Sequence, residues 1–255
     1  MTWVVATQQV SATNNFENLL MNKTTQTEGF SLIEMAIVLV IIGLLLGGLL
    51  TPLSTQREIS NIKETQELLE ETMLAIMGYA YSNNGAFPCP DTDNDGLENG
   101  ATTCNQQEGN VPWATLGTSN GDSFRGNRLG YRIDAIIDNH APISCSATAT
   151  ISICSESTCA VETPLTNAAA LVLWSHGKNG FGATNTQGST NIAPTSTDEL
   201  ANIHTTNDAL SANKVFVKRI RTDGTSSAGE FDDIIEYRTG VLLCAKMVEA
   251  GIITP

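Results

Sequence analysis

The sequence has few basic residues for its size. Its 255 residues include 13 Lys and Arg against 27 Asp and Glu, which gives a formal net charge of −14. A surface of this sign repels phosphate backbones, so we do not expect nucleic acid as a partner. Charged residues make up 16% of the chain and hydrophobic residues 41%. This composition excludes a solvated disordered polymer and favours one folded domain with an appendage.

The signatures of common hydrolases and metalloenzymes are missing. The chain has only three histidines, at positions 140, 176 and 204. It contains no G-x-S-x-G elbow, H-E-x-x-H helix or Cys-His signature. The glycine-rich run at residues 175–182 lacks the G-K-[ST] ending of a phosphate-binding loop, and we interpret it as a structural turn. We therefore expect a protein that is not an enzyme and binds no organic cofactor.

The six cysteines include no C-x-x-C pair of the kind that zinc ribbons and thioredoxin-like sites use. All six follow one long apolar run. If that run leads out of the cytoplasm, every cysteine reaches an oxidising compartment, where disulfides persist. Cys89 with Cys104 is the first pair we expect, because these residues bracket a short turn-rich loop, and the other four would pair among themselves. The candidates are Cys89, Cys104, Cys145, Cys154, Cys159 and Cys244.

The apolar run covers residues 30–51 and holds a single charged residue, Glu34. Residues 56–81 then repeat apolar side chains at the spacing of an amphipathic helix. Together the two segments predict one helix over residues 30–81, about 75 Å long at 1.5 Å per residue. Residues 30–51 are long enough to span a membrane.

Three interpretations of this run compete. It is too long for a secretory signal, and no A-x-A-like cleavage site follows it. A plain membrane anchor leaves Glu34 unexplained, because an ionisable side chain inside a membrane segment costs about 2.5–3.5 kcal/mol. The third interpretation rests on the run GFSLIEM at residues 29–35, which resembles the leader junction of type IV pilins and of the pseudopilins of type II secretion systems.

The resemblance implies that a prepilin peptidase cuts after Gly29 and that Phe30 is methylated as the new first residue. Residues 1–29 would then be the leader, with Met21 as an alternative true start. The cut creates an α-ammonium group on Phe30, four residues from Glu34. In a filament of parallel helices this group can pair with Glu34 of a neighbouring subunit. The pairing makes both buried charges tolerable and sets the axial register.

From residue 82 onward, short β-branched runs alternate with Gly, Asn, Asp and Ser clusters. Strands are expected at residues 128–137, 148–153, 168–174, 215–220 and 234–238, with a short helix near residues 198–203. The predicted fold class is α+β. A long N-terminal helix packs on a mostly antiparallel sheet, as in pilins, and residues 82–255 form a disulfide-bonded periplasmic head.

An acidic loop in the head has the spacing of a calcium site. Asp91, Asp93 and Asp95 precede a glycine, as at the opening of an EF-hand-like loop, and Glu98 is a fourth candidate ligand. The usual bidentate Glu at position twelve is missing, because residue 102 is Thr. A solvated turn held by a disulfide is the alternative to calcium binding.

A second acidic segment, FDDIIEY at residues 231–237, is interpreted as a solvated turn that enters an edge strand. The alternative is that it supplies cation ligands together with the glycine-rich run at residues 175–182.

The predicted function is that of a structural subunit, a minor pilin or pseudopilin. Before assembly it would sit in the bacterial inner membrane with its head in the periplasm, and it would then join a pilus or a secretion pseudopilus. The expected partners are the prepilin peptidase, other pilin or pseudopilin subunits and the inner membrane, and the one expected cofactor is Ca²⁺. The alternative is a membrane-anchored, calcium-dependent adhesin or ligand-binding protein.

Overall fold

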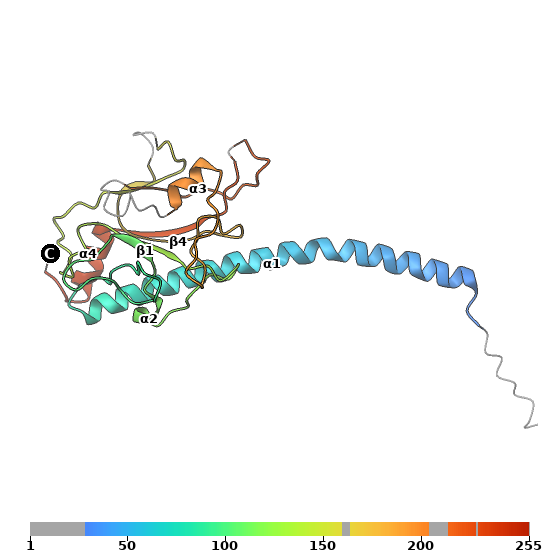
Figure 1. The fold of residues 1–255 in the computed structure, drawn as a ribbon, viewed down its shortest axis with the longest axis horizontal. Helices are drawn as coiled ribbons and strands as arrows, with labels where there is room; N and C mark the ends of the chain where they lie inside the picture. Colours follow the sequence, from blue (N-terminus) through green and yellow to red (C-terminus); the bar gives the residue numbers. More distant parts are fainter. Residues whose placement is uncertain (1–28, 160–163, 204–213, 228, 255) are drawn as a thin grey trace, which may run out of the picture. The chain divides into compact units, whose positions relative to one another are not determined.

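The computed structural model describes residues 29–159, 164–203, 214–227 and 229–254. The predicted leader, apart from Gly29, and the alternative start at Met21 lie outside these ranges. The chain divides into two compact units, with the boundary between Leu53 and Ser54. The elements confirm the predicted α+β class: a long N-terminal helix precedes a mostly antiparallel sheet (Figure 1).

Helix α1 runs from Leu32 to Ser82, 51 residues, close to the predicted range. It ends where Asn84 and Gly85 adopt positive φ angles of 55° and 86°. The Gly85 amide donates to the carbonyl of Ala80 at 2.8 Å, which closes the last turn. The part of α1 from Ser54 onward belongs to the same compact unit as the sheet.

The sheet has six strands and is built around the longest of them, β4. The strands are β1 (Glu108–Asn110), β2 (Gly130–Ile133), β3 (Ile151–Cys154), β4 (Thr166–Ser175), β5 (Val215–Val217) and β6 (Ile234–Thr239). Their order is β1-β2-β4-β3-β5, and β6 also pairs with β4. All pairs are antiparallel except β3 with β5.

Both faces of β4 are buried, because its side chains alternate between two apolar clusters. Leu171 and Leu173 face the cluster that α1 covers, whereas Val172 and Trp174 face the second cluster. From α1 the first cluster receives Leu69, Met73, Ile76 and Ala80. Figure 1 shows α3 (Thr197–Asn202) on the side of the strands away from α1. The amphipathic half of α1 is therefore a core element of the head.

Two helices were not predicted, α2 (Trp113–Leu116) and α4 (Gly240–Glu249). Helix α4 starts directly after β6, with no loop between them. The Thr239 side chain accepts a hydrogen bond from the Leu242 amide and caps the helix. The near-continuous apolar run of residues 241–248 gives no helical periodicity, so the sequence did not indicate where β6 ends and α4 begins.

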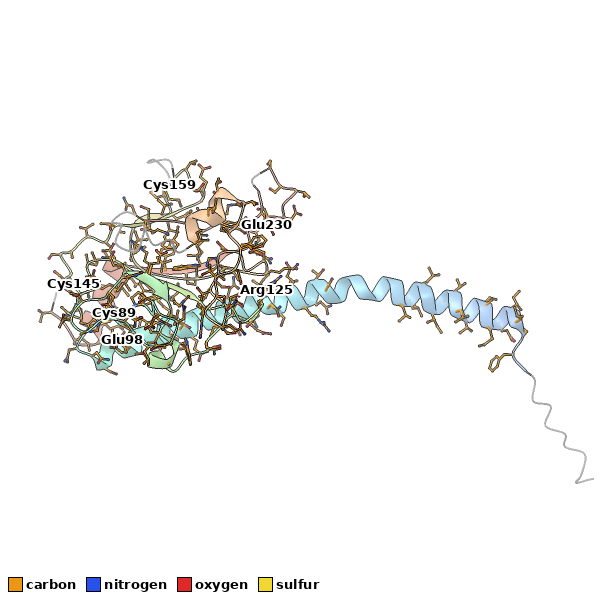
Figure 2. The ribbon with its side chains drawn as sticks, in the orientation of Figure 1. Cys89, Glu98, Arg125, Cys145, Cys159 and Glu230 are labelled. Carbon is orange, nitrogen blue, oxygen red and sulfur yellow. A yellow bond between two sulfur atoms is a disulfide. The ribbon has the colours of Figure 1, made fainter. Side chains whose placement is uncertain are left out.

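Three disulfides cross-link the head. Cys89 bonds to Cys104, the pair favoured from the sequence. The other four cysteines pair among themselves as Cys145–Cys244 and Cys154–Cys159. Figure 2 places Cys159 at the top of the head, away from Cys89 and Cys145.

Measured by length and mean hydropathy, none of the helices in the described part of the chain qualifies as a membrane span.

Candidate functional site

The predicted cleavage junction lies just before the first helix. Gly29 and Phe30 are outside α1, which begins at Leu32. The Phe30 side chain is 82% exposed, and no other described group lies within 4 Å of where a Cβ on Gly29 would be. Among the described residues, nothing covers the Gly29–Phe30 bond.

Ser31 and Glu34 cap the start of α1 reciprocally. The Ser31 amide donates to Glu34 Oε2 at 2.8 Å, and the Glu34 amide donates to Ser31 Oγ at 3.2 Å. This arrangement is a capping box, which satisfies two amides that the helix cannot pair internally. It holds the Glu34 carboxylate at the N-terminal end of the helix, the end that carries the positive pole of the helix dipole.

The first turns of α1 expose apolar side chains on all sides. The exposed residues are Leu32, Ile33, Met35, Ile37, Val38, Leu39, Val40, Ile41, Ile42, Leu44, Leu45 and Leu46. A helix that is apolar all round is normally buried in a protein core or a membrane. This part of α1 therefore needs a cover that a single copy of the described chain does not supply.

Three of the four predicted calcium ligands lie together in the head. Oxygen atoms of Asp91, Asp93 and Asp95 come within 4.8 Å of one another. Asp91 is fully buried, and its carboxylate accepts hydrogen bonds from the amides of Asn94 at 2.7 Å and Gly96 at 2.8 Å. Burial raises the pKa of Asp91, and these hydrogen bonds oppose the rise. The same bonds shape a tight loop, so this geometry also serves the alternative of a structural turn.

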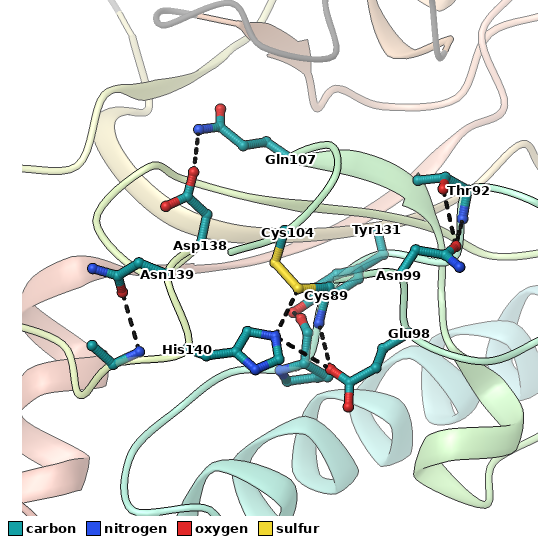
Figure 3. The surroundings of a disulfide bond; sticks show 12 residues. Cys89, Thr92, Glu98, Asn99, Cys104, Gln107, Tyr131, Asp138, Asn139 and His140 are labelled. Carbon is teal, nitrogen blue, oxygen red and sulfur yellow. Dashed lines mark hydrogen bonds and ion pairs between the residues drawn. A yellow bond between two sulfur atoms is a disulfide. The ribbon is translucent and has the colours of Figure 1, made fainter. Parts of the chain in front are cut away.

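Glu98, the fourth predicted ligand, is engaged elsewhere. Its carboxylate accepts hydrogen bonds from the Tyr79 hydroxyl at 2.6 Å and from the Cys89 amide at 3.0 Å. His140 Nε2 lies 3.6 Å from the same carboxylate and 2.9 Å from Cys89 Sγ (Figure 3). Burial and the bond to Glu98 raise the pKa of Tyr79. Glu98 thus connects Cys89, and with it the Cys89–Cys104 disulfide, to Tyr79 of α1.

A further acidic cluster joins Glu199, which was not predicted as a site residue, to the segment at residues 231–237, for which cation binding was the alternative interpretation. Glu199 of α3 comes together with Asp232 and Asp233, which directly precede β6, and one carboxylate oxygen of each lies within 4.8 Å of the others. All three residues are buried, so the interpretation of residues 231–237 as a solvated turn was wrong. Burial is the main cause that raises the pKa of Glu199 to about 7 and that of Asp232 to about 6.

The sequence indicated only part of this acidic cluster. The Asp-Asp pair before an apolar strand was visible, but Glu199 lies 33 residues before Asp232. Nothing in the local pattern connected the two segments.

Comparison with known families gave one match, which falls on the N-terminal segment. The model of the prokaryotic N-terminal methylation motif matches residues 26–50. The matched residues include the Gly29–Phe30 junction, Glu34 and most of the apolar run. Neither the search of curated proteins nor the search of solved structures found a match.

Proposed function

Because the chain carries the N-terminal methylation motif, the signature of type IV pilin and pseudopilin processing, we propose that it is a structural subunit of a type IV pilus or type II secretion-like filament. The observation that supports this proposal best is the order of features at the N-terminus. An accessible Gly29–Phe30 bond, a capped acidic residue at Glu34 and a helix with apolar side chains on every side follow one another directly.

Each feature has a task in the proposed assembly. Prepilin peptidase cuts after Gly29, and Phe30 becomes a methylated N-terminus with a positive charge. Before assembly the apolar half of α1 resides in the inner membrane, with the head in the periplasm, where an oxidising environment suits three disulfides. In the filament, neighbouring helices cover the apolar side chains. Glu34 then pairs with the Phe30 ammonium group of an adjacent subunit, because neither charge is tolerable alone in an apolar core.

The bulk and charge of the head favour a tip or low-copy position, that of a minor pilin or pseudopilin. The chain has a net negative charge. If every subunit of a shaft carried this head, close packing of the heads would bring like charges together. Stoichiometry in purified filaments tests this point, and a copy number equal to that of the shaft subunit would contradict it.

The decisive experiment is N-terminal mass spectrometry on the protein from its native cell. We expect a mature chain that starts at methylated Phe30. A chain that keeps its leader would contradict the filament proposal and would instead support the alternative of a membrane-anchored adhesin or ligand-binding protein.

Glu34→Ala tests assembly separately from processing. The variant should be cleaved normally, but its incorporation into filaments should fall by about a hundredfold or more, because one member of a buried ion pair is lost. Glu70→Ala is the matched control, since Glu70 is an exposed acidic residue on the same helix. Undiminished incorporation of Glu34→Ala would rule out the pairing.

A further inference from the structure

The cluster of Glu199, Asp232 and Asp233 concentrates three carboxyl groups inside the head. The three residues are only 2%, 6% and 6% exposed. Buried carboxylates are normally paired with a cation or fully hydrogen-bonded, because an isolated buried charge is costly.

Hydrogen bonds satisfy one oxygen of each carboxyl group. Glu199 Oε1 accepts from the Asp232 amide at 3.0 Å and from Asn179 Nδ2 at 3.1 Å. Asp232 Oδ2 accepts from the Asn179 amide at 2.9 Å, and Asp233 Oδ2 accepts from Asn202 Nδ2 at 2.7 Å. These bonds fix the three side chains in place.

The second oxygens of two of these carboxyl groups are not satisfied in this way. Glu199 Oε2 and Asp232 Oδ1 are buried and have no hydrogen-bond partner among the described residues. Arg221 attracts Asp232 electrostatically, but its guanidinium group donates to Glu58 at 2.9 Å. The fixed donors therefore position the carboxyl groups without satisfying the second oxygens of Glu199 and Asp232.

His176 provides a second, independent observation. It is 4% exposed, and its Nε2 accepts a hydrogen bond from the indole N–H of Trp174 at 3.0 Å. Because that indole can only donate, Nε2 carries no proton, and the ring is neutral with its proton on Nδ1. Nδ1 has no hydrogen-bond partner in the described part of the chain and lies 3.7 Å from Asp233 Oδ1. His176 is thus aimed at the cluster, but this tautomer brings it no positive charge.

We propose that Glu199, Asp232 and Asp233 bind a divalent cation, with Ca²⁺ as the preferred ion. Carboxylate oxygens are the ligands that hard cations select, and Ca²⁺ accepts irregular coordination more readily than Mg²⁺ does. The ion would give the two unpartnered oxygens a partner. The site is separate from the Asp91 loop.

An open cavity reaches one of the three proposed ligands, Asp232. Asp232 and Asn179 line a cavity of about 460 Å³, whose other walls include Arg125, Lys178 and Glu230. Figure 2 labels Arg125 and Glu230 on this part of the head. A hydrated ion can enter by this route and lose water as it reaches the buried oxygens.

A bound ion would tie together two segments that are distant in sequence, and the hydrogen bonds of Asn179 connect a third segment to them. Glu199 belongs to α3, Asp232 and Asp233 precede β6, and Asn179 belongs to the turn after β4. The proposal does not depend on filament assembly, because it concerns only the stability of the head.

Calcium titration of the full-length chain in detergent tests the proposal. After removal of bound metal with a chelator, the Tm and calorimetric binding are measured with CaCl₂ and, in parallel, MgCl₂. We expect one strong Ca²⁺ site per chain, weaker Mg²⁺ binding and a Tm that rises with Ca²⁺ concentration.

Two variants locate the ion. Glu199→Gln keeps the size of the side chain and should weaken Ca²⁺ binding by more than about tenfold. The matched control is the double variant Asp93→Asn/Asp95→Asn, which alters the exposed acids of the other loop and should keep the wild-type Tm rise. The proposal is overturned if wild type shows no Tm rise at saturating Ca²⁺. It is equally overturned if the rise survives in Glu199→Gln and disappears in the Asp93/Asp95 variant.

Discussion

The acidic cluster in the head makes stability depend on pH when no cation is bound. Burial, together with repulsion from Asp233, raises the pKa of Glu199 from 4.5 to about 7 and that of Asp232 from 3.8 to about 6. At a pH between the lower and the raised pKa of each group, the carboxyl group keeps its proton in the folded head but has released it in the unfolded chain. The contribution of these two groups to the free energy of unfolding is therefore largest below about pH 4 and falls as pH rises toward 7.

We accordingly predict that, in the presence of a chelator, the Tm falls between pH 4.5 and pH 7.5. Each kcal/mol by which the free energy of unfolding falls lowers the Tm by about 2–4 °C in a protein of this size. Thermal unfolding followed by circular dichroism measures the change. Glu199→Gln should flatten the profile, because its amide does not titrate, whereas Glu70→Gln on the surface of α1 should leave it unchanged. An equal slope in wild type and Glu199→Gln would contradict this assignment.

At the level of single residues, the local sequence was enough to predict the N-terminal site but indicated only part of the acidic cluster in the head. Gly29, Phe30 and Glu34 occur within one short motif whose register is fixed along the chain, so they could be predicted. Glu199 could not, because tertiary folding brings it to Asp232. Glu98 differs again: its spacing fits a calcium loop, but its carboxylate accepts hydrogen bonds from the Tyr79 hydroxyl and the Cys89 amide, which the local pattern did not indicate.

The disulfides differ in how much chain they enclose, and this difference is testable. Cys145 and Cys244 are 99 residues apart, whereas Cys154 and Cys159 are five apart. Loop-closure entropy assigns about 4.7 kcal/mol to the first bond and about 2 kcal/mol to the second. Replacing each pair by Ser should therefore lower the free energy of unfolding more for Cys145/Cys244. Denaturant unfolding of the two double variants measures this, and equal losses would contradict the entropic argument.

At the level of elements, periodicity identified α1 and most strands, but it did not locate every boundary. Residues 128–137 were predicted as one strand, whereas β2 covers only Gly130–Ile133. The amide of Asp134 still donates to the Ala170 carbonyl, but its side chain turns to accept from the amide and hydroxyl of Thr150. A polar side chain that bonds to a neighbouring segment ends a strand in a way that β propensity does not register.

The boundary at Ser54 predicts different behaviour for the whole chain and for its larger unit. A fragment of residues 54–255 contains all three disulfides and both apolar clusters. We expect it to fold cooperatively and remain monomeric without detergent. The chain from Phe30 onward should associate under the same conditions, because the exposed apolar side chains of α1 then face water.

Size-exclusion chromatography with light scattering measures both states, and thermal unfolding checks that the fragment is folded. A monomeric longer chain would contradict the role given to the apolar surface. A fragment that fails to fold would show that the head needs residues before Ser54.

For the molecule as a whole, composition and pattern were sufficient for the fold class, because a long helix followed by short β-branched runs allows few α+β arrangements. The pairing of the strands was not predictable. Strand β5 joins β3 in parallel although their neighbours are antiparallel, and β4 pairs with β2, β3 and β6. Such pairings bring together side chains that are distant in sequence, such as Trp174 and Phe216, whose ring centres lie 5.0 Å apart, and no local signal indicates that contact.

The bond between Cys145 and Cys244 also decides how the head carries mechanical load. The polypeptide between these residues contains β3, β4, α3, β5 and β6. When the two ends of the oxidised chain are pulled apart, force passes from Cys145 to Cys244 through the sulfur atoms and bypasses this whole segment. Extension is then confined to residues outside the covalent loop, so most of the sheet is shielded from stretching for as long as the disulfide stays intact.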